Sequence, residues 1–187
     1  RLLTFARKPA PVQVGYLGYL GTTGRAAMDY KITDAAMDPE GLTECFHTER
    51  LIRLPHSMWC YSPPEQAPEP ACTPAIQRGY VTFGSFNNSA KVTPEVVDAW
   101  GRILRALPHA RLIMVTKGDG SVHDYFRGQF ARNGIAPERV ELQRRMSLAE
   151  YLRLHSEVDI TLDTFPYTGG TTSCHSLWMG VPVITLP

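Results

Sequence analysis

Hydrophobic and polar positions follow a regular order in the second part of the chain, where strand-like runs alternate with helix-like stretches. The runs that are rich in β-branched and aromatic residues predict strands at residues 80–86, 111–115, 140–142, 159–162 and 183–186. Apolar residues at helical spacing predict helices over residues 94–106, 122–133, 147–155 and 171–179. This alternation favours an α/β fold with a parallel sheet that is covered on both faces.

The ends of these helices carry the expected signals. Thr93 is a suitable N-cap, and Pro94 fits the first turn of the helix that follows it. Ser147 and Glu150 have the spacing of a capping box. Gly134 stands where a helix would end.

A Pro-rich segment divides the chain. Residues 62–74 contain five Pro, which fix the backbone and remove hydrogen-bond donors, so we expect an extended surface segment. We therefore predict a first lobe over residues 1–61, a linker over residues 62–78 and a second lobe over residues 79–187. Short strands are predicted in the first lobe at residues 12–16, 30–33 and 51–54.

Composition narrows the possible partners. The formal net charge of +1 over 187 residues gives no field that would favour nucleic acid or a membrane surface. No apolar run approaches the roughly 20 residues of a membrane helix. The four Cys show no metal-binding spacing, which favours reduced thiols in a cytoplasmic protein without a metal site. Both ends resemble cuts within a longer chain.

The most informative loop covers residues 164–172 (TFPYTGGTT), between a predicted strand and a predicted helix. Gly169 and Gly170 permit close backbone approach, and Thr171 and Thr172 add hydroxyls beside the free amides of the helix start. This combination suits a phosphate group. A Gly-rich turn with an ordinary Thr cap explains the same residues equally well.

Two further loops are candidates. Residues 86–91 (FNNSAK) leave the first strand of the second lobe, so Lys91 is a candidate for neutralising a diphosphate and Asn88 for binding a phosphate or sugar hydroxyl. A turn with a solvated Lys91 is the plainer alternative. Residues 18–24, which contain Gly21, Thr22 and Thr23, can border a sugar or an acceptor, or can form a tight turn.

These three loops and their surroundings resemble one family. Residues 12–24, 28–34, 82–91, 163–172 and 178–183 together are similar to the catalytic region of the O-linked N-acetylglucosamine transferase and SPINDLY family, in the same order and spacing along nearly the whole chain. The Phe165-Pro166-Tyr167 sequence is closest to the bacterial and SPINDLY branch of that family.

The resemblance implies a GT-B fold in which the second, Rossmann-like lobe binds the donor nucleotide, while residues 1–61 are the end of the first catalytic lobe. It implies inverting transfer of a sugar, GlcNAc from UDP-GlcNAc first of all, to Ser or Thr of an acceptor protein. It implies no metal or other cofactor, with Lys91 neutralising the diphosphate. The residues that it assigns to the donor are Asn88, Lys91, Gly169, Gly170, Thr171, Thr172 and His175.

Two positions depart from the family pattern. His175 stands where the family often has an acidic residue for the ribose, and Leu20 replaces a Pro in the first-lobe loop. Three alternatives remain open: a fucosyl donor, an Asn acceptor, and a sugar-nucleotide-binding module without catalysis. Family members carry tetratricopeptide repeats upstream, together with the rest of the first lobe, so the general base is expected there and the isolated chain is expected to be inactive.

Overall fold

A computed structural model describes residues 2–118 and 120–186 and divides the chain into two compact units. The first unit is Arg1–Ser62 and the second is Pro63–Pro187. Each unit has its own parallel sheet. No helix within the described residues is long and apolar enough to cross a membrane.

The first unit contains a small sheet with strand order β1-β2-β3. Its strands and helical segments are α1 Leu2–Ala6, β1 Val14–Gly15, β2 Tyr30–Asp34, the 3-10 turn η1 Glu44–Phe46 and β3 Arg50–Leu54. Polar contacts stabilise this unit: the Asp34 carboxylate accepts a hydrogen bond from the Met58 amide at 2.6 Å. Asp38 is buried and accepts from the Thr33 hydroxyl at 2.5 Å.

The Pro-rich segment forms neither helix nor strand from residue 63 to residue 74, but a short helix, α2 Ala75–Arg78, follows it. This helix falls within the last residues of the predicted linker, 62–78. Asp159 explains the difference, since its carboxylate accepts from the Ala75 amide at 2.7 Å and from the Thr82 amide at 2.7 Å. This contact over a large sequence distance fixes the start of the helix in a way that local sequence does not reveal.

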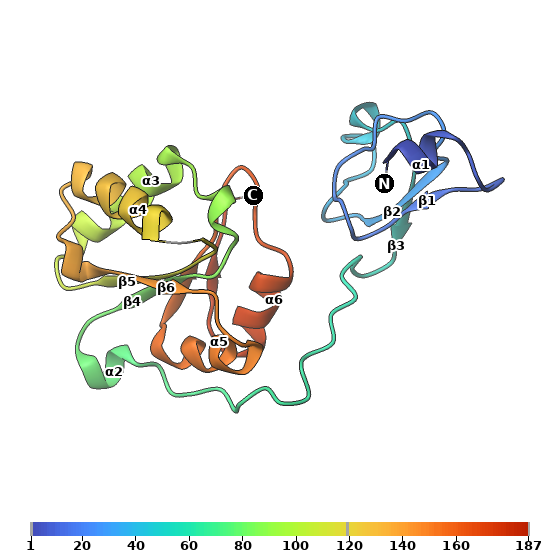
Figure 1. Ribbon diagram of the computed structural model, residues 1–187. Helices are drawn as coiled ribbons and strands as arrows, with labels where there is room; N and C mark the ends of the chain where they lie inside the picture. Colours follow the sequence, from blue (N-terminus) through green and yellow to red (C-terminus); the bar gives the residue numbers. More distant parts are fainter. Residues whose placement is uncertain (1, 119, 187) are drawn as a thin grey trace. The chain divides into compact units, whose positions relative to one another are not determined.

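The second unit is built on a five-stranded sheet with strand order β6-β5-β4-β7-β8, and all its strand pairs are parallel (Figure 1). The strands are β4 Thr82–Ser85, β5 Arg111–Thr116, β6 Val140–Arg144, β7 Ile160–Leu162 and β8 Val183–Ile184. The predicted parallel α/β architecture is confirmed, although several strands are shorter than predicted.

Helices cover both faces of this sheet. They are α3 Pro94–Ala106, α4 Gly120–Arg132, α5 Leu148–Leu154 and α6 Thr171–Trp178, with the 3-10 turns η2 Ser89–Lys91, η3 Pro137–Arg139 and η4 His155–Glu157. Figure 1 shows α3 and α4 on one face and α5 and α6 on the other. The predicted caps are present: Thr93 accepts from the Val96 amide, and Ser147 and Glu150 form a reciprocal capping box.

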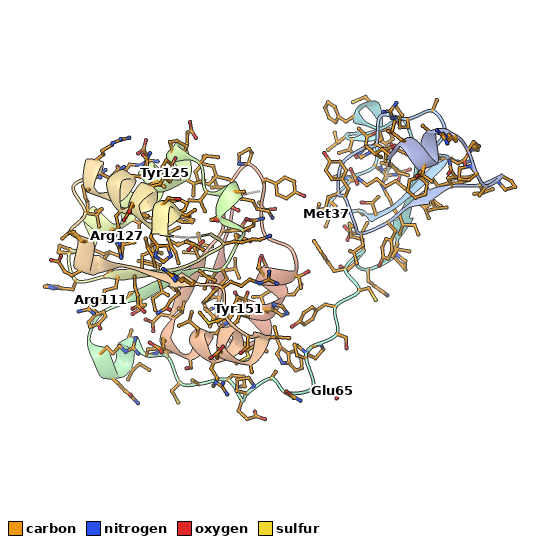
Figure 2. The ribbon with its side chains drawn as sticks, in the orientation of Figure 1. Met37, Glu65, Arg111, Tyr125, Arg127 and Tyr151 are labelled. Atoms are coloured by element: carbon orange, nitrogen blue, oxygen red, sulfur yellow. The ribbon has the colours of Figure 1, made fainter. Side chains whose placement is uncertain are left out.

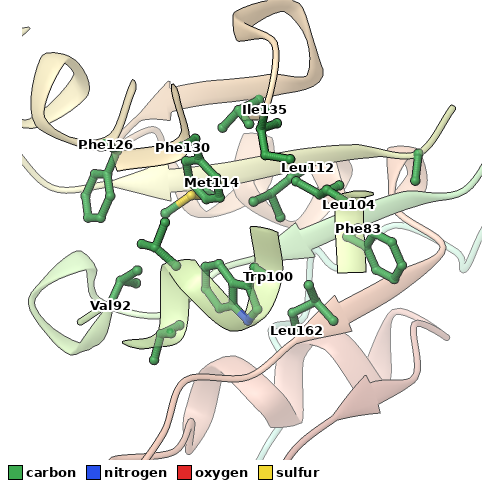
Figure 3. Packing of buried hydrophobic residues seen from close by; sticks show 14 residues of the cluster. Phe83, Val92, Trp100, Leu104, Leu112, Met114, Phe126, Phe130, Ile135 and Leu162 are labelled. Atoms are coloured by element: carbon green, nitrogen blue, oxygen red, sulfur yellow. The ribbon is translucent and has the colours of Figure 1, made fainter. Parts of the chain in front are cut away.

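The main core lies under α3 and α4. Trp100 is 2% exposed and packs with Phe83, Leu104, Leu112 and other apolar side chains (Figure 3). A smaller cluster on the opposite face includes Phe86 and Ile113. Strand β4 between these clusters is buried throughout and β5 and β7 are mostly buried, which is typical of the central strands of a parallel sheet that is covered on both faces.

Candidate functional site

The candidate site lies where the order of the strands changes direction. From β4 the chain adds β5 and β6 on one side, and then adds β7 and β8 on the other side of β4. The loops that follow β4 and β7 therefore leave the sheet in opposite directions and border a crevice, which is where open α/β sheets bind ligands. These two loops are the ones that the sequence singles out.

Asp163 organises the loop after β7. Its Oδ1 atom accepts from the Gly169 amide at 2.7 Å and from Asn87 Nδ2 at 2.6 Å. Its Oδ2 atom accepts from the Thr185 hydroxyl at 2.9 Å. Asn87 in turn accepts from the Thr172 hydroxyl at 2.6 Å, through Oδ1. One buried carboxylate and one amide thus tie the two loops and the start of α6 together.

Gly169 allows this close packing. A Cβ atom at this position would overlap Ser173 Oγ and would lie 3.0 Å from Asn87 Oδ1 and 3.1 Å from Asp163 Oδ1. Hydrogen bonds hold both Asn87 and Asp163, so neither can move aside easily. The absence of a side chain at residue 169 is therefore a steric requirement of the loop.

Lys91 reaches the same loop from the end of β4. Its Nζ atom donates to the Thr168 carbonyl at 2.8 Å and lies 4.3 Å from the centre of the Tyr167 ring. Burial lowers the pKa of Lys91, against the opposing attraction of the Asp163 carboxylate. Asn88 caps η2, because its Oδ1 atom accepts from the Ala90 amide at 3.2 Å. The Lys91 ammonium thus contacts the residue that directly precedes Gly169 in the loop.

A cavity of about 490 Å³ opens at the carboxyl ends of β4, β5 and β6. Its wall combines aromatic, basic and hydrogen-bonding side chains, and no acidic residue is found among the described residues that line it. Tyr151 of α5 is one of these residues (Figure 2). The lining includes Phe86, Asn88, Lys117, Arg145, Tyr151 and Thr172. Apolar walls with a few polar groups are typical of small-molecule sites.

The predicted donor-binding residues fall into two groups. Asn88 and Thr172 line the cavity directly. Five others are absent from its described lining and lie on the adjoining loops and on α6: Lys91, Gly169, Gly170, Thr171 and His175. The His175 ring lies 5.6 Å from that of Tyr151, and burial lowers the pKa of His175.

Sequence reasoning missed part of this site. It gave no role to Asn87, Lys117 or Arg145. Lys117 and Arg145 each follow a predicted strand of the same sheet, so the rule that ligands bind at carboxyl ends of strands could have identified them. No local signal indicates the pairing of Asn87 with Asp163.

In the first unit, Glu49 anchors the loop that contains Gly21, Thr22 and Thr23. Its carboxylate accepts from the Thr22 hydroxyl at 2.6 Å and from the Thr23 amide at 2.7 Å, and it also accepts from the Thr23 hydroxyl. Burial raises the pKa of Glu49, but these hydrogen bonds outweigh it and lower the pKa to about 2. An ionised carboxylate therefore anchors this loop, which the sequence did not indicate.

The sequence of the chain is similar to that of known proteins along nearly its whole length. The sequence model described as "Glycosyl transferase family 41" matches residues 1–62 and 75–187. Proteins named "Probable UDP-N-acetylglucosamine--peptide N-acetylglucosaminyltransferase SPINDLY" from Solanum lycopersicum and Petunia hybrida are each 47% identical over the whole chain. The chain spans about a fifth of the length of these relatives (20% in both).

A solved structure supports the same comparison. A mutant of the Thermobaculum terrenum O-GlcNAc transferase superposes with a TM-score of 0.88 at 41% sequence identity. The match covers 98% of this chain and 35% of that protein. The similarity therefore extends over both units of the chain.

Proposed function

The chain belongs to glycosyl transferase family 41, and from this premise we propose that its protein transfers a sugar from a nucleotide donor to Ser and Thr hydroxyls of acceptor proteins. UDP-GlcNAc is the first choice of donor, since the names of the SPINDLY relatives specify it. The observation that carries the proposal is the cavity at the carboxyl ends of β4, β5 and β6, where aromatic, basic and hydroxyl side chains meet.

In this proposal the donor diphosphate binds beside the amino end of α6. Gly169 and Gly170 allow the phosphates to approach the backbone, and Thr171 and Thr172 offer hydroxyls and amides at the positive end of the helix dipole. Lys91 supplies a positive charge from the facing loop. Asn88 contributes a hydrogen bond to a phosphate or sugar hydroxyl, and His175 one to the ribose.

The nucleoside occupies the cavity itself. Phe86 and Tyr151 provide aromatic wall, while Lys117 and Arg145 add positive charge next to an anionic donor. A volume of about 490 Å³ is within the range of sites for small molecules of this size.

The proposed reaction is an inverting displacement. The acceptor hydroxyl attacks the anomeric carbon from the face opposite the diphosphate, a new C–O bond forms, and the bond between the sugar and the diphosphate breaks. Lys91 and the donors at the start of α6 stabilise the negative charge that develops on the leaving diphosphate. The hydroxyl proton leaves to a base that we assign outside this chain. The loop with Gly21, Thr22 and Thr23 borders the sugar or the acceptor.

In this assignment, side chains and backbone amides of the protein neutralise the charge of the diphosphate, so that no metal ion or other cofactor is required. It is supported by the hydrogen bond from Lys91 Nζ to the Thr168 carbonyl, which brings the ammonium group to the loop before α6. If the assignment is correct, an excess of EDTA should leave transfer unchanged, whereas a loss of activity that Mg²⁺ or Mn²⁺ restores would contradict it.

We further propose a cytoplasmic location and upstream tetratricopeptide repeats that present the acceptor. All four Cys have free thiols in the structure, which fits a reducing compartment. Cell fractionation tests the location, since recovery only from a secretory compartment would refute it. Sequencing the gene upstream of this region tests for the repeats.

The central experiment incubates the full-length protein with labelled UDP-GlcNAc or GDP-fucose and with peptides that carry Ser and Thr, Asn, or none of them. We expect label from UDP-GlcNAc on Ser and Thr peptides. Label from GDP-fucose only, or on Asn only, would change the assigned donor or acceptor. Nucleotide binding, detected as a rise in Tm, without any transfer would instead indicate a binding module.

A further inference from the structure

A buried histidine lies directly behind the cavity wall. His155 is 1% exposed and is the first residue of η4, immediately after α5. It is absent from the described lining of the cavity. Three lining residues nevertheless meet it or its hydrogen-bond partner: Phe86, Tyr151 and Thr172.

The contacts of the imidazole use its ring face and both nitrogens. The ring stacks on Phe86 with a centroid distance of 3.9 Å and an interplanar angle of 20°. Its Nδ1 atom lies 2.9 Å from the Tyr151 carbonyl oxygen, which can only accept, so Nδ1 carries the proton. The Tyr151 ring packs edge-on against the imidazole at 5.0 Å.

The other nitrogen connects to α6. His155 Nε2 lies 3.3 Å from the hydroxyl of Ser176, which is fully buried. The Ser176 hydroxyl accepts from the Thr161 hydroxyl at 3.2 Å, and its single proton is shared between His155 Nε2 and the Thr172 carbonyl, which lies 3.2 Å from the Ser176 oxygen. A neutral imidazole with its proton on Nδ1 accepts at Nε2, and burial lowers the pKa of His155 to about 4, so this form persists at neutral pH.

We propose that His155 is a positioning residue that holds the Phe86 ring, α5 at Tyr151 and α6 at Thr172 in the arrangement that binds the donor nucleotide. This inference rests on the proposed function. Three elements that are separate in the sequence meet on one side chain, so the wall of the cavity has its correct shape only while both hydrogen bonds and the stack are intact.

Two substitutions test the proposal in the full-length protein. His155→Phe keeps an aromatic ring against Phe86 but removes both hydrogen bonds. Ser176→Ala removes the partner of Nε2 and keeps the imidazole. Each variant should weaken the affinity for UDP or GDP, by roughly tenfold for His155→Phe. The double variant should bind no more weakly than His155→Phe alone, because the two residues act through one contact.

If His155 had a purely structural role, its replacement would lower Tm without changing the nucleotide affinity of the folded protein. The control is a core substitution outside the described lining of the cavity. Val97→Ala, in the separate core beneath α3, should lower Tm but leave nucleotide affinity unchanged at temperatures where every variant is folded. Equal affinity of wild type and folded His155→Phe would overturn the proposal. Where His155→Phe does not fold, Ser176→Ala decides, and unchanged affinity in that variant overturns it. A wild type that binds neither UDP nor GDP refutes the proposed function, and the inference falls with it.

Discussion

At the residue scale, the charged and polar side chains that organise the site are mostly held by other parts of the protein. Asp163 uses both oxygens to fix the loop and the end of β8, and Lys91 is bound to the Thr168 carbonyl. A preorganised donor such as Lys91 costs less to align on ligand binding than a solvated one does. The effects of substitution should therefore depend on geometry as well as on charge.

Replacing Lys91 tests the charge. We expect Lys91→Ala to weaken binding of UDP or GDP by about 1–3 kcal/mol, the cost of losing a hydrogen bond from a charged group. Isothermal titration calorimetry measures the change directly. Arg102→Ala removes an equal charge from an exposed position on α3 and should leave the affinity unchanged. Unchanged affinity in the Lys91 variant would remove this residue from the site.

Replacing Gly169 tests the geometry. Gly169→Ala adds a Cβ that overlaps Ser173 Oγ and crowds Asn87 and Asp163, so we expect a loss of about 1–3 kcal/mol in stability together with weaker nucleotide binding. Urea denaturation and calorimetry measure the two effects. Gly128→Ala is the matched control: this helical residue has open space around its Cβ position, and the variant should be slightly more stable than wild type.

At the element scale, the sequence predicted best where the structure depends on local signals. Helix α3 has the predicted bounds, Pro94–Ala106, because its cap and its apolar spacing lie within one stretch of sequence. Helix α2 was not predicted, since its start depends on the contact of the Ala75 amide with Asp159. Trp100 in α3 is buried whereas Trp178 in α6 is 50% exposed, and helical periodicity alone did not distinguish the two.

The cap of α5 allows a test at this scale. Ser147→Ala removes the side chain that accepts from the Glu150 amide and also removes its hydrogen bond to the Glu150 carboxylate. We expect a loss of about 1 kcal/mol in the free energy of unfolding. Ser156→Ala, whose exposed hydroxyl donates to one carbonyl, should cost less than about 0.5 kcal/mol. Equal losses in both variants would show that the capping box adds no stability.

At the scale of the whole molecule, the predicted division into parallel strands and covering helices follows from periodicity, but the site depends on contacts between distant segments. Asn87 and Asp163, for example, are 76 positions apart in the sequence and are joined by a hydrogen bond. The rule for strand ends brings both loops to one edge of the sheet. Which side chains then pair, and which line the cavity, follows only from packing in three dimensions.

The two units should respond to acid over different pH ranges. In the second unit the pKa of His155 is lowered from 6.5 to about 4 by burial, and burial lowers that of His175 as well. Below pH 6.5 the unfolded chain binds protons that the folded unit does not, so stability is complete above this pH and falls as the pH drops towards 4. For His155 the loss is about 3 kcal/mol at most.

The first unit should begin to lose stability only at lower pH. The pKa of Glu49 is lowered from 4.5 to about 2, and those of Asp34 and Asp38 are also lowered, so their contributions are present above about pH 4.5 and are lost towards pH 2. Hydrogen exchange resolved by peptide, from pH 7.5 to pH 3, measures each unit separately. His155→Phe should flatten the pH dependence of the second unit between pH 6.5 and 4, whereas His109→Phe, at an exposed position, should not. An unchanged slope in the His155 variant would show that other groups control the acid response of that unit.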